Sequence, residues 1–236
     1  MSAIAVIQAR MSSSRFPGKV LADLDGLPMA VFMARRMGQC KLLDRVVIAT
    51  SDEVSDDPLA QAAIDHGLNV FRGPLNDVLG RFAMVQAIEQ ADVIVRMTAD
   101  CPLCDWNVID NLIQLRNDRN ADYASNIDPR TFPHGLDCEV FTAATLSRAQ
   151  ASARNDYDRE HVTTWMRSNN AALIRTNLLY SKNRSALRLT VDHPADLDLV
   201  RAIIAGVGVQ AGLDDIVAWA DAHPEVTARN AAHRVI

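Results

Sequence analysis

The chain opens with Ala3-Ile-Ala-Val-Ile7, which runs into the loop Gln8-Ala-Arg-Met-Ser-Ser-Ser-Arg-Phe-Pro-Gly-Lys19. The five apolar residues have the length and composition of a buried β-strand. The loop after them carries three cations, three hydroxyl groups and one glycine. In open α/β sheets, ligands bind beyond the carboxyl ends of the strands. This stretch therefore predicts an α/β fold with a ligand site at the end of the first strand.

The three cations of this loop, Arg10, Arg15 and Lys19, favour a ligand with several phosphate groups, such as a nucleoside triphosphate. Arginine forks onto phosphate oxygens, and lysine supplies a point charge. Serine hydroxyls and the backbone N–H groups of a loop add further donors. A polar surface loop with scattered charge is the alternative. Three cations within ten residues at the end of a strand make that alternative the less favoured one.

Two familiar phosphate-binding loops do not fit this stretch. A dinucleotide-binding fingerprint needs GxGxxG after the first strand, and here no glycine precedes Gly18. A Walker loop needs GxxxxGK followed by Ser or Thr. Ser13 stands at the position of its first glycine, and Val20 follows the lysine. The loop therefore indicates a nucleotide site of another kind.

Beyond this loop, β-branched apolar runs alternate with helical patterns. Strands are expected at 45–50, 68–71, 92–97, 173–178 and 187–191, and helices at 28–37, 58–66, 76–90, 107–116, 143–152, 159–169, 194–205 and 214–222. Continuous apolar strands are typical of a mostly parallel sheet that is buried on both faces. We therefore expect a three-layer α/β fold with helices on both faces of the sheet. No linker or repeat interrupts the chain, which predicts one domain over 1–236, with a loop-rich excursion near 127–141 for acceptor binding or dimerisation.

The composition excludes several classes of protein. Of the 236 residues, 49% are hydrophobic and 22% are charged, as in ordinary globular proteins. The net charge of −5 gives no basic field for nucleic acid. No apolar run approaches the ~20 residues that cross a bilayer, and no signal peptide is recognisable at the start. We therefore expect a cytoplasmic protein with neither a nucleic-acid nor a membrane partner.

The four cysteines are too few for a disulfide scaffold in a chain of this size. Cys101-Pro-Leu-Cys104 has the spacing of a redox pair or of half a zinc site. A zinc site needs further nitrogen or sulfur ligands, and the chain has no second CxxC and no HxxxH motif. Two small, semi-buried thiols are the favoured interpretation.

The segment Ile7-Gln-Ala-Arg-Met-Ser-Ser-Ser-Arg-Phe-Pro-Gly-Lys-Val-Leu21 resembles the opening motif of the cytidylyltransferases that activate Kdo and sialic acid. It is most similar to the branch named after spore-coat polysaccharide biosynthesis protein F. Further blocks match that branch in order, namely Asp77-Val-Leu-Gly-Arg81, Val95-Arg-Met-Thr-Ala-Asp-Cys-Pro-Leu103, Phe132-Pro-His-Gly-Leu-Asp-Cys-Glu-Val-Phe141, Asp158-Arg-Glu-His-Val-Thr163 and Arg188-Leu-Thr-Val-Asp-His-Pro-Ala-Asp-Leu197. The resemblance therefore covers nearly the whole chain.

The resemblance implies a nucleotide-diphospho-sugar transferase type of fold, CTP as the donor, Mg²⁺ as the metal and a homodimer. It implies that the nucleotide-binding residues are Gln8, Ala9, Arg10, Ser12, Ser13, Arg15, Lys19, Arg81 and Thr98. It further implies that the catalytic residues are Arg10, Arg15, Lys19 and Asp100.

Two carboxylates, Asp100 and Asp192, each follow an expected strand and can converge on one metal ion. In the resemblance, both match the metal-binding aspartates of the family, although Ala99 stands where glycine is usual. From the residues alone, a turn cap at Asp100 and a helix N-cap at Asp192 are the alternatives. Asp196 and Asp198 are expected to be acids of a first helical turn that face water.

Mixed cations and acids in the middle of the chain form the candidate acceptor site: Arg130, His134, Asp137, Glu139, Glu160 and His161. Arg130 or His134 can pair with a carboxylate or phosphate of an acceptor. Asp137 and Glu139 alternate with apolar residues, so the solvent face of a strand is the alternative for them. For Glu160, the alternative to acceptor binding is an ordinary acid in the first turn of a helix.

The sequence thus favours an enzyme that transfers CMP from CTP to an acidic or polyhydroxylated acceptor and releases pyrophosphate. The acceptor would be a sugar acid or a phosphate or phosphonate compound, in surface polysaccharide or glycoconjugate biosynthesis. A glycosyltransferase that uses a preformed nucleotide sugar is the alternative, since the fold is shared. A non-catalytic nucleotide-binding regulator is less favoured, because it need not keep the second metal aspartate.

Overall fold

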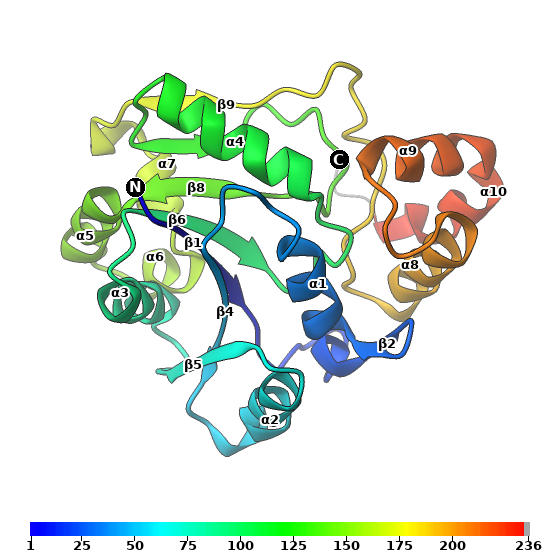
Figure 1. The fold of residues 1–236 in the computed structure, drawn as a ribbon, viewed down its shortest axis with the longest axis horizontal. Coiled ribbons are helices and arrows are strands. Elements are labelled where there is room, and N and C mark those ends of the chain that lie inside the picture. The colour runs from blue at the N-terminus through cyan, green and yellow to red at the C-terminus, as the bar shows by residue number, and fades with distance from the viewer. Residues whose placement is uncertain (234–236) are drawn as a thin grey trace.

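The computed structural model describes residues 1–233 and contains a seven-stranded sheet with the order β5-β4-β1-β6-β8-β7-β9 (Figure 1). The strands are β1 (Ala3–Gln8), β4 (Arg45–Ser51), β5 (Asn69–Gly73), β6 (Val93–Thr98), β7 (Tyr123–Ser125), β8 (Glu139–Thr142) and β9 (Arg175–Asn177). A separate hairpin joins β2 (Asp23–Leu24) to β3 (Leu27–Pro28). The strands expected near the start of the chain are therefore present, with boundaries that differ by a few residues.

The sheet is mostly parallel, as expected. Strand β1 pairs in parallel with both β4 and β6, and β5 pairs in parallel with β4. Only β8 runs the other way, because it is antiparallel to both β6 and β7. The carboxyl ends of β1 and β6 therefore lie side by side at one edge of the sheet, where a ligand site is expected.

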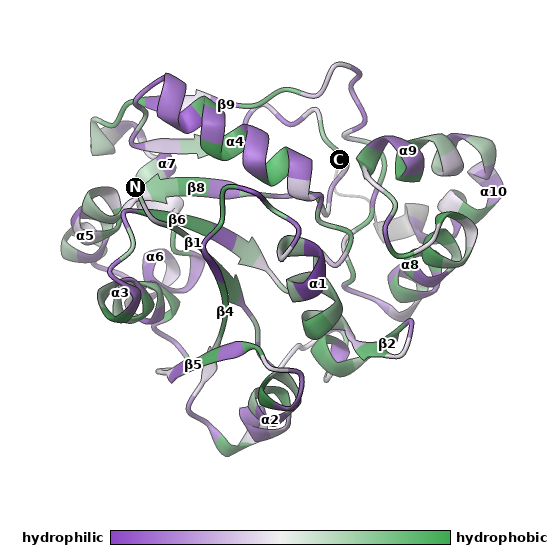
Figure 2. Cartoon of the chain, viewed as in Figure 1, coloured by the Kyte–Doolittle hydropathy of each residue, from purple (hydrophilic) through white to green (hydrophobic). Residues whose placement is uncertain are grey.

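Helices cover both faces of the sheet, and the side chains of β1 alternate between two cores. Ala3, Ala5 and Ile7 face a core with α1 (Met29–Met37), α2 (Asp57–Asp65) and α4 (Trp106–Asp118). Ile4 and Val6 face a core with α3 (Val78–Glu89) and α5 (Ala143–Ser152). Figure 2 shows hydrophobic and hydrophilic residues alternating along α4, as expected of a helix that covers one face of a sheet. The architecture is thus the three-layer α/β fold that the sequence predicts.

The C-terminal helices form a third core beside the sheet. They are α8 (Pro194–Val207), α9 (Leu213–Ala222), α10 (Pro224–Thr227) and the 3₁₀ segment η4 (Ala228–His233). The apolar faces of α8, α9 and α10 pack with the hairpin, with α1 and with Leu189 and Val191. Among the described residues, no helix is both long and apolar enough to cross a membrane.

Two predicted elements differ in the structure. The helix expected at 159–169 is divided into α6 (Asp156–His161), α7 (Thr164–Arg167) and the 3₁₀ segment η3 (Asn169–Ala171), because Val162 has a φ of 60° and interrupts the helix. The strand expected at 187–191 joins no ladder and makes one isolated bridge, between Arg188 and His134. Its apolar residues are buried in the C-terminal core instead, which explains the strand-like pattern. The remaining 3₁₀ segments are η1 (Lys19–Leu21) and η2 (Val54–Asp56).

Candidate active site

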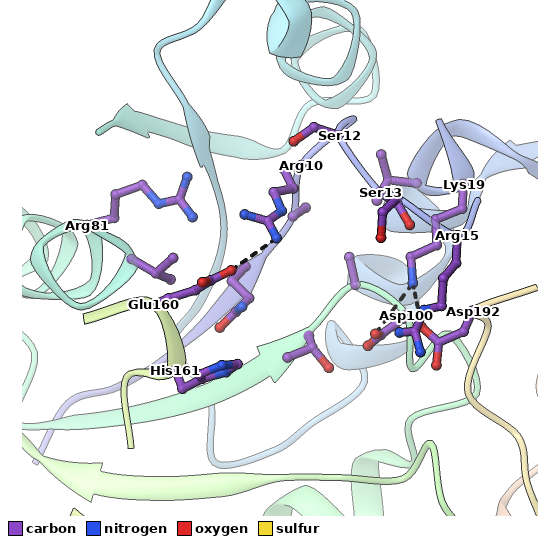
Figure 3. Close-up of a pocket in the computed structure, with 17 residues that line it drawn as sticks. Arg10, Ser12, Ser13, Arg15, Lys19, Arg81, Asp100, Glu160, His161 and Asp192 are labelled. Atoms are coloured by element: carbon purple, nitrogen blue, oxygen red, sulfur yellow. Dashed lines mark hydrogen bonds and ion pairs between the residues drawn. The ribbon is translucent and has the colours of Figure 1, made fainter. Parts of the chain in front are cut away.

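A cavity of about 310 Å³ lies at the carboxyl ends of β1 and β6 (Figure 3). The loop after β1 forms one wall, α3 and α6 form the other, and Thr98 to Asp100 lie between them. All predicted nucleotide-binding residues line it, namely Gln8, Ala9, Arg10, Ser12, Ser13, Arg15, Lys19, Arg81 and Thr98. Residues from five separate segments of the sequence are thus brought to one place.

The loop after β1 is held in shape by a buried carboxylate that the sequence analysis did not single out. Asp56 accepts hydrogen bonds from the backbone N–H of Met11 at 2.7 Å and of Ser51 at 3.1 Å. Burial raises the pKa of Asp56, but the hydrogen bonds outweigh it and the net shift is downward, so the carboxylate stays ionised. The loop then turns at Gly18, whose φ of 72° lies in the left-handed region, and η1 begins with Lys19.

Lys19 joins the two predicted metal-binding aspartates. Its Nζ lies 3.1 Å from Asp192 Oδ1 and 3.5 Å from Asp100 Oδ2, and it donates to the Val191 carbonyl at 2.7 Å. The Lys19 side chain is 10% exposed, and Arg15 lies at the cavity mouth, where its Nη2 donates to Asp192 Oδ1 at 2.8 Å. Both carboxylates therefore approach the same ammonium group, and their binding of a metal ion stays a prediction.

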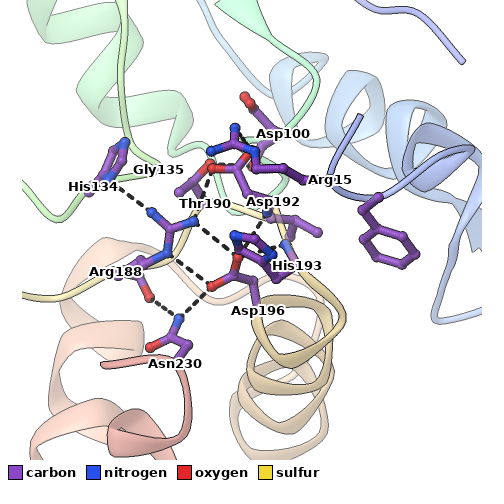
Figure 4. Close-up of polar contacts among 12 residues, drawn as sticks. Arg15, Asp100, His134, Gly135, Arg188, Thr190, Asp192, His193, Asp196 and Asn230 are labelled. Carbon is purple, nitrogen blue, oxygen red and sulfur yellow. Dashed lines mark hydrogen bonds and ion pairs between the residues drawn. The ribbon is translucent and has the colours of Figure 1, made fainter. Parts of the chain in front are cut away.

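Asp192 is not the N-cap of α8, which is His193. Its carboxylate instead faces Arg15 and Arg188 (Figure 4), and it also contacts Lys19. Burial raises the pKa of Asp192, but the positive charge of Lys19 and hydrogen bonds from Lys19 and Arg188 outweigh it, and the net shift is downward. The capping interpretation is therefore wrong for Asp192.

Asp196 does not face water, contrary to expectation. Its side chain is buried and pairs with Arg188, with Nε to Oδ1 at 3.0 Å and Nη2 to Oδ2 at 3.0 Å. It also accepts the backbone N–H groups of Asp192 and His193, both at 2.9 Å. Asp198, in contrast, is exposed as predicted. Of the two acids expected in the first turn of α8, Asp196 lies in that turn and is structural, whereas Asp198 lies beyond it and faces solvent.

Arg81 lies at the far end of the cavity from Asp192, with its guanidinium buried (Figure 3). Among the described residues, its Nε and Nη1 have no hydrogen-bond partner. Burial lowers the pKa of Arg81, and Arg10 lowers it further, while nearby aspartates raise it. Arg10 itself is paired with Glu160 at 3.2 Å. Buried donors without partners are rare in proteins, so this end of the cavity is built for a ligand that offers acceptors.

The helix α6 is fixed to α3 by one ion pair. Asp77 caps α3 by accepting the Gly80 N–H at 2.8 Å, and its other oxygen pairs with Arg159 at 2.6 Å. This pair brings Glu160 and His161 to the first cavity. Both residues were grouped with the acceptor side, but the structure places them beside Arg10 and Arg81 instead.

Two further cavities adjoin the first one at Thr98. One of about 340 Å³ is lined by Asp100, His134, Asp137 and residues around Asp192. The other, of about 210 Å³, is lined by Arg96, Thr98, Ile127, Arg130, Asp137, Glu139 and Arg167. Four of the predicted acceptor residues, Arg130, His134, Asp137 and Glu139, are thus gathered beside the first cavity.

The charges in the smallest cavity are mostly paired. Arg130 Nη2 lies 2.7 Å from Asp137 Oδ2, and Glu139 pairs with Arg96 and accepts from the Tyr123 hydroxyl. Glu139 is 3% exposed, so the solvent face of a strand is the wrong interpretation for it. Among residues 1–233, the Arg167 side chain makes no hydrogen bond or ion pair, and it is exposed. Arg167 is therefore the cation of this cavity that remains free for an anion, and the sequence analysis did not identify it.

The segment 127–141 is held against 187–191 by backbone hydrogen bonds and by a close backbone contact at Gly135. The N–H of His134 donates to the Leu187 carbonyl at 2.9 Å, and the N–H of Leu189 donates to the His134 carbonyl at 2.6 Å. Gly135 has a φ of 110°, and a Cβ there would lie 2.3 Å from the backbone nitrogen of Thr190. Only glycine fits this close approach, which sets His134 and Asp137 beside Asp192.

The cysteines fit the interpretation of inert thiols. Cys101 and Cys104 are free and buried, and burial raises the pKa of Cys104 to about 12. Among the described residues, no group of three or more His, Cys, Asp or Glu side chains forms a metal site. A cation in the first cavity would therefore depend on the two aspartates and on ligand oxygens.

Comparison with known proteins agrees with this geometry. The family model described as Cytidylyltransferase matches residues 4–211. The spore coat polysaccharide biosynthesis protein SpsF of Bacillus subtilis is 37% identical over 213 residues, which cover 86% of each chain. The match therefore extends over the cavity, the Asp192 segment and the loop near Gly135.

Solved structures share the fold. A cytidylyltransferase from Leptospira borgpetersenii serovar Hardjo-bovis superposes with a TM-score of 0.93 at 29% identity, covering 100% of this chain and 99% of the other. A CMP:2-keto-3-deoxy-manno-octonic acid synthetase in complex with CTP superposes with a TM-score of 0.69 at 21% identity, covering 87% of this chain and 99% of the other. With its fold, its cavity and its sequence in agreement, this chain belongs to the cytidylyltransferase family of nucleotidyltransferase enzymes.

Proposed function

We propose that the chain transfers a cytidylyl group from CTP to an anionic, hydroxylated acceptor and releases pyrophosphate. The observation that carries the proposal is the division of the first cavity. Lys19, Arg15 and the two aspartates lie at one end, and Arg81, whose Nε and Nη1 have no partner among the described residues, lies at the other beside the Arg10–Glu160 pair. A nucleoside triphosphate has the same division, with phosphates at one end and a base at the other. A protein of similar fold was solved in complex with CTP, which supports CTP as the nucleotide.

The base is assigned to the Arg81 end. Cytosine carries two neighbouring acceptors, O2 and N3, whereas N3 of uracil carries a hydrogen and is a donor. A guanidinium offers only N–H donors, so it favours cytosine, with two acceptors, over uracil, whose N3–H would face a donor. Because the free donors of Arg81 are buried, a mismatched base would leave them without partners, which costs about 1–3 kcal/mol. This chemistry supports CTP as the donor substrate.

The triphosphate is assigned to the loop after β1. Arg10, Arg15 and Lys19 supply charge there, and the Ser12 and Ser13 side chains supply hydroxyl donors. Charges placed in advance around a leaving pyrophosphate stabilise the transition state without reorganising at the moment of reaction. The same cations would neutralise the triphosphate when it binds.

Asp100 and Asp192 are suited to hold one divalent cation, which we propose to be Mg²⁺. Both approach the Lys19 ammonium, so a cation already lies between them in the protein. Mg²⁺ prefers one or two carboxylates together with phosphate oxygens and water. When bound, the ion would neutralise the phosphates and favour the departure of pyrophosphate.

The acceptor is assigned to the two cavities that meet the first one at Thr98. Arg167 would bind a carboxylate or phosphate of the acceptor, and Asp137 and His134 would contact its hydroxyl groups. Arg130 is less available, because Asp137 already pairs with it in a bidentate manner. This arrangement supports an acceptor with an anion at one end and a nucleophilic oxygen at the other.

In the proposed reaction, an acceptor oxygen forms a bond to the α-phosphorus while the bond from that phosphorus to the bridging oxygen of pyrophosphate breaks. An acceptor phosphate or phosphonate oxygen attacks as an anion, and a hydroxyl gives up its proton to solvent. Thr98 lies where the donor and acceptor cavities meet, so the reacting atoms would lie near it. Holding both substrates in line is the main contribution of such a site.

The test is a pyrophosphate-release screen in which CTP, UTP, ATP and GTP are each combined with Mg²⁺ and with sugar acids, polyol phosphates and phosphonates. Release of pyrophosphate with CTP and one acceptor class, together with the largest thermal stabilisation by CTP, would support the proposal. Equal stabilisation by all four nucleotides would refute cytidine selectivity. Turnover of a preformed nucleotide sugar alone would identify a glycosyltransferase instead.

Two further expectations accompany the proposal. The similarity to a spore coat polysaccharide biosynthesis protein supports a role in surface polysaccharide or glycoconjugate biosynthesis. A homodimer also remains a prediction, and light scattering of the purified protein tests it. A monomer that retains full turnover would contradict it.

A further inference from the structure

A group of buried polar side chains lies directly behind Asp192, on the side away from the nucleotide cavity (Figure 4). Arg188 is 3% exposed, and Asp196 and Asn230 are each 1% exposed. Charged and amide groups are seldom buried to this extent unless they are fully paired. Neither Asp196 nor Asn230 lines a cavity described above, so neither residue can contact a substrate.

Asp196 is the centre of this group. Its Oδ1 accepts from Arg188 Nε at 3.0 Å and from Asn230 Nδ2 at 2.9 Å. Its Oδ2 accepts from Arg188 Nη2 at 3.0 Å and from the backbone nitrogens of Asp192 and His193, both at 2.9 Å. The carboxylate thus fixes the Arg188 guanidinium and the Asp192 backbone at once.

Arg188 divides its donors between two aspartates. Its Nε and Nη2 form the bidentate pair with Asp196, and Nη2 also donates to Asp192 Oδ2 at 2.9 Å. Nη1 lies 3.5 Å from Nδ1 of His134, which belongs to the segment 127–141. Because the fork is planar and engaged along one edge by Asp196, it reaches only one oxygen of Asp192.

The two oxygens of Asp192 are therefore not equivalent. Oδ2 is turned inward to Arg188, whereas Oδ1 is turned to the cavity, where Lys19 at 3.1 Å and Arg15 at 2.8 Å contact it. When phosphates draw Lys19 and Arg15 away, Oδ1 is released while Oδ2 stays held. One oxygen would then point at the place where the cation and the triphosphate meet.

We propose that Asp196 and Arg188 are positioning residues that hold Asp192 as a ligand with one oxygen facing the divalent cation. The inference rests on the proposed function. Without the Asp196 charge, the Arg188 fork is free to take both oxygens of Asp192, which turns Oδ1 away from the cavity. Partners behind a metal ligand typically change metal affinity by about 10- to 100-fold when they are mutated.

The test compares Asp196→Asn with Asp198→Asn, which is the same substitution two residues further along the same helix, at an exposed position. The measurement is the Mg²⁺ concentration that gives half of the thermal shift induced by saturating CTP, which requires no turnover. We expect Asp196→Asn to raise this concentration about 10- to 100-fold, and Asp198→Asn to leave it unchanged. The shift that CTP induces in EDTA should be the same for both variants.

A merely structural role would give a different result. In that case Asp196→Asn would lower the melting temperature while its Mg²⁺ requirement matched that of the wild type, and the inference would be overturned. If Asp196→Asn does not fold, Arg188→Lys takes its place, because lysine keeps the charge but lacks the planar fork that pairs with both oxygens of Asp196 while it reaches Asp192. An unchanged Mg²⁺ requirement in that variant would also overturn the inference. A wild-type protein without any Mg²⁺-dependent shift would refute the proposed function as well, so the two failures are distinguishable.

Discussion

Lys19 is expected to stabilise the free protein and to donate to the leaving group during the reaction. Replacing it by alanine should separate these two effects. In the free protein its ammonium is buried between Asp100 and Asp192 and donates to the Val191 carbonyl at 2.7 Å. The variant leaves that carbonyl and part of the Asp192 charge without a donor, although Arg15 and Arg188 remain. The loss of one buried charge-assisted hydrogen bond costs about 2–3 kcal/mol.

For a chain of 236 residues, that cost corresponds to a melting temperature lower by about 4–6 °C. Mg²⁺ without nucleotide should restore part of the lost melting temperature of Lys19→Ala, because the space between the two carboxylates no longer holds the lysine ammonium. At ten times its dissociation constant, Mg²⁺ returns about 1.4 kcal/mol, or about 3 °C. The wild type should respond less to Mg²⁺ alone, because Lys19 occupies that space.

The assay is a thermal shift in EDTA and in Mg²⁺, with and without CTP, together with pyrophosphate release at saturating substrate. Turnover of Lys19→Ala should fall about 100-fold or more, since a donor to the leaving group is lost. Lys182→Ala is the matched control, because Lys182 is exposed. A Lys19→Ala variant with wild-type stability and unaltered CTP dependence would refute the placement of Lys19 between the carboxylates.

Three other outcomes follow from the structure. Arg81→Met should weaken CTP binding about 10-fold or more and reduce the preference for CTP over UTP in thermal-shift titrations, since its unpaired donors are assigned to the base; an unchanged preference would remove Arg81 from the base site. Arg167→Ala should raise the KM for the acceptor about 10-fold with little change in the KM for CTP. Arg154→Ala, at an exposed position, should alter neither KM. Equal effects of the two variants would exclude the assignment of Arg167 to the acceptor. Because burial raises the pKa of Cys104 to about 12, its thiol should stay protonated at pH 8 and resist a disulfide reagent until the protein unfolds, and rapid labelling of the native protein would contradict this.

The nucleotide end of the site could be predicted because its residues are local in the sequence. The loop after β1 carries its cations within one segment, and Asp100 follows directly after β6. Parallel strands bring such segments to the same edge of a sheet, so order along the chain is enough to place them. The convergence of Asp100 and Asp192 was predicted on the same ground, although the segment before Asp192 is not a ladder strand.

The roles of Asp196 and Arg167 could not be predicted because they depend on tertiary contacts. An acid in the first turn of a helix usually faces water, and nothing near Asp196 in the sequence reveals that Asn230, 34 residues later, reaches its carboxylate. Arg167 lines the cavity assigned to the acceptor because Val162 interrupts the helix before it, at a φ of 60° that a valine seldom adopts. A continuous helix, as the pattern predicts, would direct this arginine elsewhere.

The close contact at Gly135 limits how acceptor specificity can be redesigned. A library that randomises the whole segment between β7 and β8 would contain mostly misfolded members, because any side chain at this position collides with Thr190. The side chains of Asp128 and Pro129, in contrast, are exposed. A chimera that grafts this segment from a relative should therefore keep the glycine and its pairing with Leu187 and Leu189, and diversify the tip of the loop.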